Sequence, residues 1–217
     1  MKYICKGAEP TVFTQWKAVN PQATYKDLSD RQFPDSVPTK AALKQALITE
    51  QGGLCCYCEC RIQPHNSHIE HFKPKGDPLY SAFQLDYSNL LASCGIRPCL
   101  GSDEHCGHKK GCFYTTDLIS PLEVDCSSHF TYKLDGTIGH TDNRGDITIR
   151  KLHLDSSLLN RQRKSLIDYF LTFDDEELQE EIAAHLDNTC SIFGEFYTMI
   201  DFLHSNGNLY SNRRVMS

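Results

Sequence analysis

The residues best able to do chemistry in this chain lie between positions 55 and 106. Two kinds of group are interleaved there: thiols in two separate groups, and a carboxylate, an imidazole and an amide between them. In chain order they are Cys55, Cys58, Glu70, His71, Asn89, Cys94 and Cys106. Thiols suit a structural metal ion, whereas a carboxylate beside an imidazole suits metal-assisted catalysis. The sequence therefore predicts two neighbouring sites, one structural and one catalytic.

The C-x-x-C pair of Cys55 and Cys58 can place two thiolates on one tight turn. Tetrahedral Zn²⁺ takes four soft ligands at about 2.3 Å, and two short pairs from distant segments commonly supply them. Cys94 and Cys106 can form the second pair, with Cys99 and Cys112 left open as alternative partners of Cys94. A redox C-x-x-C motif expects a neighbouring βαβ pattern, and none is visible. We expect the remaining cysteines to be buried apolar side chains, above all Cys5, Cys56, Cys60, Cys126 and Cys190.

The segment HIEHFKP (68–74) carries the catalytic candidates. Phosphodiester hydrolysis needs a base to deprotonate water and a cation to stabilise charge on the phosphate and the leaving oxygen. An imidazole with a pKa of about 6.5 is a suitable base at neutral pH. Glu70 is a suitable ligand for Mg²⁺ or Mn²⁺, and the amide of Asn89 can fix the orientation of the imidazole. The H-x-E-H spacing also leaves a second zinc site open.

Composition limits the class of protein. The chain has 217 residues, 11 cysteines and a formal net charge of −6. The first residues, MKYICKGAEP, lack the apolar run of a signal peptide, and no apolar stretch approaches the roughly 20 residues that span a membrane. We therefore expect a cytoplasmic protein without a membrane partner, in which clustered cysteines indicate metal before disulfide. Acidic residues gather at 174–181.

Lysines near the thiols are the expected phosphate contacts, although an ordinary solvated surface would look the same. They are Lys73, Lys75, Lys109 and Lys110.

The predicted elements give an α+β fold. Turn signals at several prolines predict an irregular segment over 1–38. Thr39 is an expected N-cap, and Gly52-Gly53 is expected to end the helix that follows. The further predicted elements are a helix at 40–51, a turn with a hairpin-like pair at 54–72, a short helix at 106–113, a hairpin at 129–142, and helices at 156–170, from 174 onward and at 191–204. Asp155 or Ser156 is the expected cap of the helix at 156–170, and the acidic run 174–177 suits the start of the next helix.

Several segments resemble a known family. They are EQGGLCCYCECRI (50–62), HIEHFKPK (68–75), DYSNLLASC (86–94), CGHKKG (106–111) and ITIRKLHLDSSLLNRQR (147–163). The chain resembles HNH endonucleases of the ββα-metal type, and among them the PtuB-type subunits of Septu and retron-associated anti-phage systems. The resemblance implies a small ββα-metal core with a four-cysteine zinc site at 52–120. Two regions would flank this core: an N-terminal loop and helix segment at 1–51 and a C-terminal hairpin and helical region at 121–217. All three parts can still pack together as one body.

The resemblance also implies roles for single residues. His71 corresponds to the general base, Glu70 to the first ligand of the catalytic ion and Asn89 to the central asparagine, while Cys55, Cys58, Cys94 and Cys106 correspond to the zinc ligands. The family pattern expects His or Asn directly after the last of these cysteines. Gly107 stands there instead, and His108 is the substitute candidate for second ligand of the catalytic ion.

The function implied is metal-dependent hydrolysis of nucleic acid, with DNA as the expected substrate and tRNA as an alternative. The implied partners are an SMC/ABC-like ATPase of the PtuA type and, in retron-associated systems, a reverse transcriptase with its RNA–DNA product. A zinc-stapled nucleic-acid or protein-binding adaptor without catalysis is the competing hypothesis, and a redox-active thiol protein is a third.

Overall fold

The computed structural model describes residues 1–28, 39–95, 103–187, 189 and 191–211. Helices predominate, and two short antiparallel sheets accompany them. The helices are α1 Thr11–Val19, α2 Thr39–Glu50, α3 Cys106–Lys110, α4 Asn143–Leu152, α5 Ser157–Phe170, α6 Asp175–His185, α7 Tyr197–Ser205 and α8 Asn208–Ser211; the strands are β1 Ser67–His71, β2 Leu90–Cys94, β3 Phe130–Tyr132 and β4 Ile138–His140. This mixture confirms the α+β class. None of the described helices is long and apolar enough to cross a membrane.

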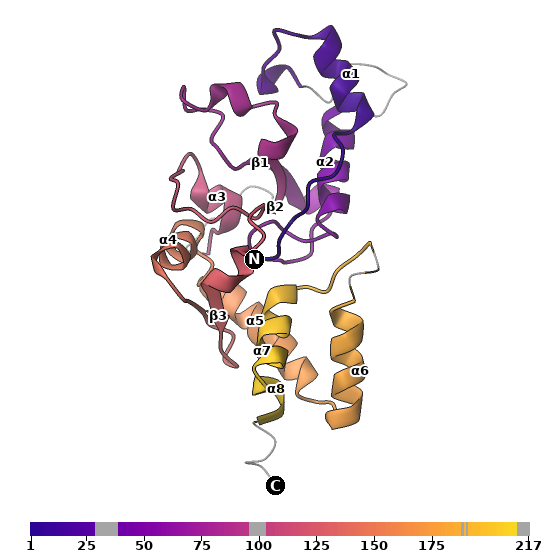
Figure 1. Cartoon of the computed structure of the whole chain (residues 1–217), viewed down its shortest axis with the longest axis vertical. Coiled ribbons are helices and arrows are strands. Elements are labelled where there is room, and N and C mark those ends of the chain that lie inside the picture. Colours follow the sequence, from indigo (N-terminus) through magenta and orange to yellow (C-terminus); the bar gives the residue numbers. More distant parts are fainter. Residues whose placement is uncertain (29–38, 96–102, 188, 190, 212–217) are drawn as a thin grey trace.

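The molecule is elongated, and its elements follow the long axis (Figure 1). α1, α2 and the β1–β2 sheet lie at one end, and α5 to α8 lie at the other. The β3–β4 hairpin and α4 lie between them, and the amino terminus also lies near the middle of the molecule.

The β1–β2 sheet carries the catalytic candidates. Its strands are antiparallel, with Glu70 opposite Leu91 and His71 opposite Leu90. Leu90 and Leu91 are both 0% exposed, so β2 is buried on both faces. α2 packs against both strands, and α3 packs against β2. The chain order strand, strand, helix is the order expected for the central segment.

Several predicted elements are confirmed. The glycines at 52 and 53 end α2, the short helix appears as α3, and the predicted hairpin appears as β3 and β4. Ser156 caps α5 by accepting a hydrogen bond from Leu159 N–H, and Asp174 caps α6. Thr39 is the first residue of α2 in the structure.

The predictions for the two ends of the chain are partly wrong. Residues 1–38 were expected to be irregular, but 11–19 form α1, because Phe13 and Trp16 share a buried face three residues apart. The last predicted helix begins at Tyr197 because the preceding Phe196 is in the left-handed region, with φ of 50°. α4 was not predicted, although Asp142 caps it.

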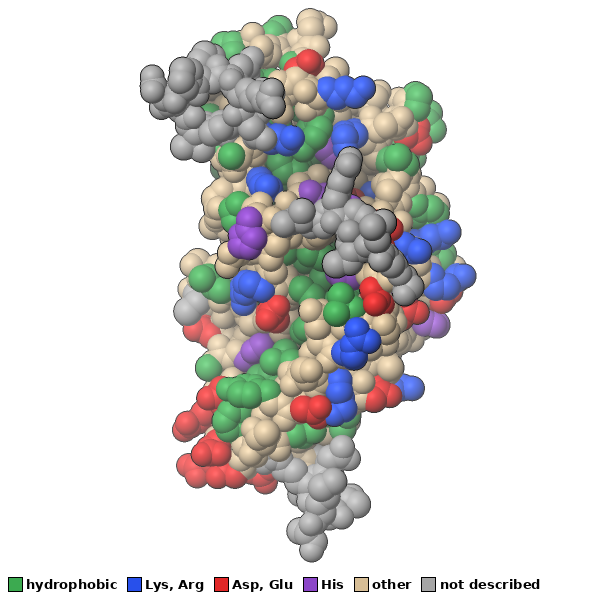
Figure 2. All heavy atoms as spheres, turned by 180° about the vertical axis from the view of Figure 1, so that it is seen from behind, with side chains coloured by type: hydrophobic (Ala, Val, Ile, Leu, Met, Phe, Trp, Pro, Cys, Tyr) green, Lys and Arg blue, Asp and Glu red, His purple; other side chains and the backbone are tan. Residues whose placement is uncertain are grey.

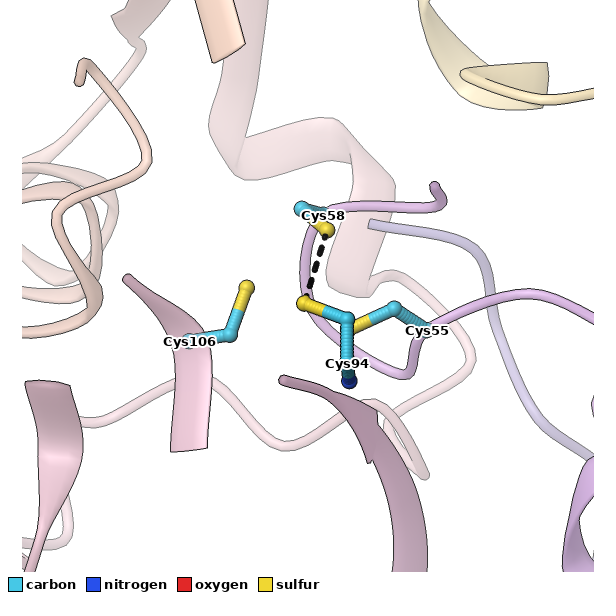
Figure 3. Close-up of side chains that lie close together, drawn as sticks. All are labelled: Cys55, Cys58, Cys94 and Cys106. Atoms are coloured by element: carbon cyan, nitrogen blue, oxygen red, sulfur yellow. Dashed lines mark hydrogen bonds between the residues drawn. The ribbon is translucent and has the colours of Figure 1, made fainter. Parts of the chain in front are cut away.

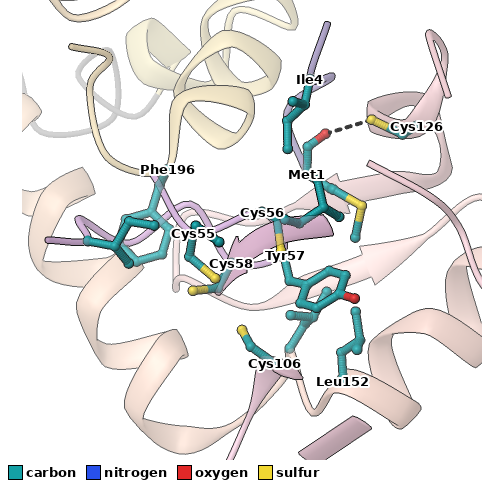
Figure 4. Close-up of a cluster of buried hydrophobic side chains, with 14 of the residues drawn as sticks. Met1, Ile4, Cys55, Cys56, Tyr57, Cys58, Cys106, Cys126, Leu152 and Phe196 are labelled. Carbon is teal, nitrogen blue, oxygen red and sulfur yellow. Dashed lines mark hydrogen bonds between the residues drawn. The ribbon is translucent and has the colours of Figure 1, made fainter. Parts of the chain in front are cut away.

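One hydrophobic cluster joins the three expected ranges 1–51, 52–120 and 121–217. Figure 4 shows side chains from distant parts of the sequence gathered in this cluster, among them Met1, Tyr57 and Phe196. The Met1 ammonium group also forms a buried ion pair of 2.6 Å with Glu59, which accepts a hydrogen bond from the Thr198 N–H group. Burial acts to lower the pKa of this ammonium group, but Glu59, with Tyr132 and Cys126, outweighs burial and raises the pKa to about 11.

Arg163 on α5 is a buried cation that joins several segments. It is 2% exposed and donates hydrogen bonds to the carbonyl oxygens of Leu154 (2.8 Å) and Gly136 (3.5 Å). Its guanidinium carbon lies 5.7 Å from the centre of the Phe196 ring. The side chain therefore links the β3–β4 turn, the α4–α5 connection and the residue before α7.

We predict that Arg163→Met lowers the free energy of unfolding by about 2–4 kcal/mol, because buried carbonyl groups lose charged donors. Arg161→Met is the matched control, since Arg161 lies on the exposed face of the same helix and should change stability by no more than about 0.5 kcal/mol. Urea unfolding followed by circular dichroism measures both values. Equal stability of the two variants would contradict this role for Arg163.

Candidate functional site

Four cysteine sulfurs meet between β2, α3 and the turn that follows α2. The Sγ atoms of Cys55, Cys58, Cys94 and Cys106 all lie within 4.8 Å of one another. Figure 3 shows the four side chains pointing toward a common centre, with Cys58 Sγ 3.7 Å from Cys94 Sγ. Bonds of about 2.3 Å to a tetrahedral ion set sulfurs about 3.8 Å apart, so the donor set and its spacing fit such an ion.

The local backbone explains how the thiols converge. Leu54 pairs with Arg61 in an isolated bridge, so the segment between them folds back as a tight turn that carries Cys55 and Cys58. Cys94 ends β2, and its N–H donates to Cys55 Sγ at 3.3 Å. Cys106 begins α3 with φ of 58°, a conformation that is costly for a residue with a Cβ. The hairpin-like pair expected at 54–72 is reduced to this bridged turn, because β1, the strand in that range, pairs with β2 instead.

The four thiols change one another's pKa through hydrogen bonds between them. Burial raises the pKa of the Cys106 thiol well above its usual range. Burial also acts to raise the pKa of Cys58, but the hydrogen bond from Cys106 and those from other thiols outweigh it and hold that pKa well below its usual range. A cation bound among the sulfurs would favour the thiolate form of all four.

The other cysteines divide into three groups. Cys56 and Cys126 are buried, as expected. Cys60 is partly exposed, and Cys5 is exposed, so the expectation for Cys5 is wrong. Cys99 and Cys190 lie outside the described residues.

Glu70 is buried on the face of β1 that points toward α3. Its Oε1 atom accepts hydrogen bonds from Lys110 Nζ at 2.8 Å and from the Tyr57 hydroxyl at 3.2 Å. Its Oε2 atom lies 3.4 Å from His68 Nε2. Burial acts to raise the pKa of Glu70, but the hydrogen bond from His68 and the charge of Lys110 outweigh burial and hold this pKa below its usual range. Hydrogen bonds to Oε1 therefore fix the position of the Glu70 carboxylate.

Lys110 does not have the exposed position expected of a phosphate contact. Its side chain is 0% exposed, and its ammonium group donates to Glu70 and to the carbonyl oxygen of His71 at 2.8 Å. The α3 register turns Lys110 toward the sheet and leaves Lys109 exposed. Lys110 is therefore a positioning residue for Glu70.

His71 follows Glu70 on the strand, so its side chain points to the opposite face of the sheet. Its ring meets Tyr25 edge to face, with centroids 4.4 Å apart. Nε2 lies 3.1 Å from the carbonyl oxygen of Gln84, so Nε2 carries the proton and donates it there. The other nitrogen, Nδ1, is buried and has no hydrogen-bond partner among the described residues. Burial, followed by the charge of Lys75, lowers the pKa of His71 to about 4.

Asn89 was expected to fix the orientation of the His71 imidazole by a hydrogen bond. In the structure Gln84 makes that hydrogen bond, and Asn89 instead fixes the loop after β1. The amide oxygen of Asn89 accepts from Lys73 N–H at 2.7 Å, and its amide nitrogen donates to the carbonyl oxygens of Lys73 (3.0 Å) and Phe83 (3.1 Å). The carbonyl oxygen of Gln84 therefore takes the hydrogen bond to His71, while Asn89 secures both ends of the segment that carries it.

Two further lysines accompany Lys75 on the face of His71. Lys75 Nζ lies 5.1 Å and Lys40 Nζ 5.7 Å from the centre of the Tyr25 ring. Lys73 lies over the Phe83 ring at 4.2 Å. In a chain with a net charge of −6, these ammonium groups give the His71 face a local positive charge.

His108, the expected second ligand, is not brought into contact with Glu70. Its Nε2 lies 3.2 Å from the carbonyl oxygen of Gly95, and its ring packs 4.5 Å from the His68 ring. Among the described residues, no group of three ligating side chains within 4.8 Å includes Glu70.

Another cluster of ligating side chains, formed by Glu123, Asp125 and His129, does not suit an ion. Glu123 pairs with Arg144 at 2.8 Å, and Asp142 accepts from His129 Nδ1 at 2.6 Å. Two of the three side chains thus already have charged partners in the fold.

Sequence reasoning did not single out Tyr57, Lys40 or Tyr25, and it considered His68 only as part of a possible second zinc site. The spacing of His68, two residues before Glu70, places both on one face of a strand and was the available signal. Tyr25 and Lys40 reach the site from distant segments and leave no local signature.

We predict that Lys110→Met raises the pKa of Glu70 and lowers the free energy of unfolding at pH 7 by about 3–5 kcal/mol, because a buried carboxylate loses its cation. A carboxyl whose pKa is lowered by folding stabilises the protein above its unfolded pKa of about 4.3, and this contribution is lost as pH falls through the folded pKa. The variant should therefore lose stability at a higher pH than the parent. Lys109→Met is the adjacent exposed control. Denaturant unfolding between pH 4 and 8 measures the effect, and parallel curves for both variants would contradict it.

Three known proteins are similar to this chain. A retron Vc95 HNH endonuclease, so named in Vibrio cholerae serotype O1 biovar El Tor, is 31% identical over 153 residues, which are 67% of this chain and 71% of the relative. A retron Ec83 HNH endonuclease of Escherichia coli is 38% identical over 99 residues, 43% of this chain and 37% of the relative. The Septu protein PtuB of Bacillus thuringiensis is 32% identical over 130 residues, 57% of this chain and 45% of the relative.

The chain thus spans less than half the length of two of these relatives. No family model matches it. The retron Vc95 relative, however, is matched over more than two thirds of its length at more than 30% identity. Together with the cysteine cluster and the Glu70-His71 pair on β1, these similarities show that the chain belongs to the HNH endonucleases related to PtuB.

Proposed function

We propose that the chain hydrolyses phosphodiester bonds of nucleic acid as a metal-dependent HNH endonuclease. The observation that carries this proposal is the state of His71. A carbonyl group holds its Nε2–H, its Nδ1 lone pair has no partner among the described residues, and its pKa lies far enough below neutral that the ring is uncharged at pH 7. A neutral imidazole with one uncommitted nitrogen is the form that can accept a proton from water.

In the proposed reaction, a water molecule attacks phosphorus and His71 Nδ1 takes the proton it loses. The bond from phosphorus to the leaving oxygen breaks, and that oxygen takes a proton from solvent. Attacking and leaving oxygens lie in line on opposite sides of phosphorus. The opposite orientations of His71 and Glu70 at one strand end are compatible with this arrangement.

Glu70 is the proposed ligand for Mg²⁺ or Mn²⁺, since its Oε2 atom points away from Lys110 and Tyr57. A divalent ion bound there would stabilise negative charge on the phosphate and on the leaving oxygen. Lys110 and Tyr57 hold the carboxylate in position, and Asn89 holds the loop that presents Gln84 to His71.

Lys73 and Lys75 are the proposed phosphate contacts, with Lys40 beside them and exposed Lys109 on α3. Phosphate contacts carry little sequence information. The proposed substrate is therefore DNA, with tRNA as the alternative, and contacts to a 2′-hydroxyl would distinguish them.

We also propose that residues 52–120 form a ββα-metal HNH core in which Zn²⁺ binds Cys55, Cys58, Cys94 and Cys106. The order of β1, β2 and α3 and the convergence of the four sulfurs support this proposal.

The names of the relatives support a role in an anti-phage defence complex. Two are named from retrons and one from a Septu system. The proposed partners are a PtuA-type ATPase of the SMC/ABC-like class and, in a retron, the reverse transcriptase with its RNA–DNA product. Figure 2 shows acidic side chains gathered at one end of the molecule, where α6 and its cap carry Asp174, Asp175, Glu176, Glu177, Glu180 and Glu181. Nucleic acid would avoid this end, which leaves it for a protein partner.

We expect the purified chain to contain one zinc ion, measured by elemental analysis. Cys58→Ser should lose the zinc and unfold at a lower temperature, because binding of a structural zinc contributes about 10–16 kcal/mol in small zinc domains. Cys112→Ser is the control, since Cys112 is exposed and lies outside the cluster. Full zinc content in the Cys58 variant would exclude this site.

His71→Gln should lower the rate of Mg²⁺- or Mn²⁺-dependent cleavage about 10²–10⁴-fold, with zinc content unchanged, because the proton acceptor is lost. His65→Gln removes an exposed histidine and should have no effect. Plasmid DNA and tRNA are both offered as substrates. Undiminished cleavage by the His71 variant would exclude His71 as the base.

The pH dependence of cleavage gives a separate test of His71. The neutral ring is the active form and its pKa is about 4. The acid limb of kcat/KM should therefore lie well below pH 6.5, since this ratio reports the free enzyme. Lys75→Ala removes a charge that lowers the pKa of His71, so it should shift the acid limb to higher pH. An acid limb at pH 6.5 in both proteins would contradict the assignment.

A further inference from the structure

Gly107 directly follows the last cysteine of the cluster and leaves a space beside β1. A Cβ atom at this position would lie 2.6 Å from Glu70 Oε2 and 2.6 Å from His68 Nε2. Such distances are too short for any side chain. Glu70 Oε2 and His68 Nε2, both from β1, thus occupy the space that a Cβ atom at position 107 would need. Only glycine at 107 allows both atoms to stay in place.

The His68 ring is oriented like that of a metal ligand. Its Nδ1 lies 3.4 Å from the carbonyl oxygen of Gly95, so Nδ1–H donates to that oxygen. Nε2 faces Glu70 Oε2, 3.4 Å away, and an ion bound between the two atoms would take the place of the proton that Nε2 donates to the carboxylate. A ligating histidine commonly donates its other N–H to a backbone carbonyl, which fixes the tautomer and the ring orientation.

The carboxylate opposite His68 is similarly prepared. Glu70 Oε1 is taken by Lys110 and Tyr57, which leaves Oε2 directed at His68. The Glu70 side chain is 8% exposed and the His68 side chain 28% exposed, so the pair is open to solvent on the histidine side. An octahedral ion with bonds of about 2.1 Å sets neighbouring ligand atoms about 3 Å apart, close to the observed separation.

We propose that His68 Nε2 and Glu70 Oε2 together bind the catalytic divalent ion, with His68 supplying the ligand that Gly107 cannot. This inference rests on the proposed function and adds a second ligand to it. A nitrogen–oxygen pair favours Mn²⁺ and later transition ions over Mg²⁺, because imidazole is a poor ligand for Mg²⁺. The remaining coordination positions are left for water and phosphate oxygens.

His108 is the competing ligand, and the contacts argue against it. Its Nε2 faces the carbonyl oxygen of Gly95, and its ring packs against the ring of His68. The two rings share that carbonyl group, but of the two histidines only His68 forms an ion pair with Glu70.

The test is Mn²⁺ binding to the zinc-loaded chain without nucleic acid, followed by electron paramagnetic resonance of free Mn²⁺. The parent should bind one Mn²⁺. His68→Ala should weaken the affinity at least tenfold, while His108→Ala should change it less than about threefold. Gly107→Ala keeps both ligands but pushes them apart, so it should weaken binding without removing a donor. Zinc content and circular dichroism check that each variant is folded.

Equal Mn²⁺ affinity in His68→Ala and the parent would overturn the inference and leave His68 and Glu70 as a structural ion pair. A larger loss in His108→Ala would overturn it in favour of His108, and a parent that binds no Mn²⁺ would also overturn it. These results are separate from those for the proposed function. If cleavage depends on His71 but Mn²⁺ affinity does not depend on His68, the proposed nuclease activity stands and the inference about His68 fails. If His68 binds Mn²⁺ but the chain does not cleave nucleic acid, the inference stands and the proposed nuclease activity fails.

Discussion

The convergence of four cysteine sulfurs is the constraint on which the rest of the structure depends. It joins the turn after α2, the end of β2 and the start of α3, three segments that have little secondary structure of their own to hold them together. Two residues beside the cysteines then face β1. Tyr57, inside the C-x-x-C turn, donates to Glu70, and Gly107, after Cys106, leaves space for Glu70 and His68. The cysteine cluster and the strand therefore form one unit.

The alternation of side chains along β1 divides the site into two faces. Glu70 is held by Lys110 and Tyr57 on one face, and His71 is held by Gln84 on the other. The carboxylate is kept charged beside a cation, whereas the imidazole is kept neutral by burial and by a nearby lysine. Glu70 and His71 are adjacent in sequence, yet their side chains lie in opposite electrostatic surroundings. The regular alternation of side chains along β1 is enough to produce this difference.

What could be predicted from the sequence was local. The C-x-x-C turn, the capped helices at Ser156 and Asp174 and the hairpin after residue 129 all follow from spacing and short-range hydrogen bonds. The long-range contacts could not be predicted in the same way. Which face of α3 carries Lys110 depends on how α3 docks on β2, and whether Asn89 or Gln84 meets His71 depends on the path of a loop. α1 was missed because its two aromatic residues bury a face that only the fold supplies.

Tyr25 covers the imidazole from a segment far away in the sequence. Its backbone N–H donates to the side chain of Gln84 at 3.1 Å, so the residue that holds His71 also holds the ring above it. Nδ1 of His71 is buried in this arrangement, so a water molecule can reach it only when side chains around it move. Proton transfer to His71, as proposed above, would then depend on how often the surroundings of the ring open. A ligand that favoured the open arrangement would raise such activity without any change to His71 itself.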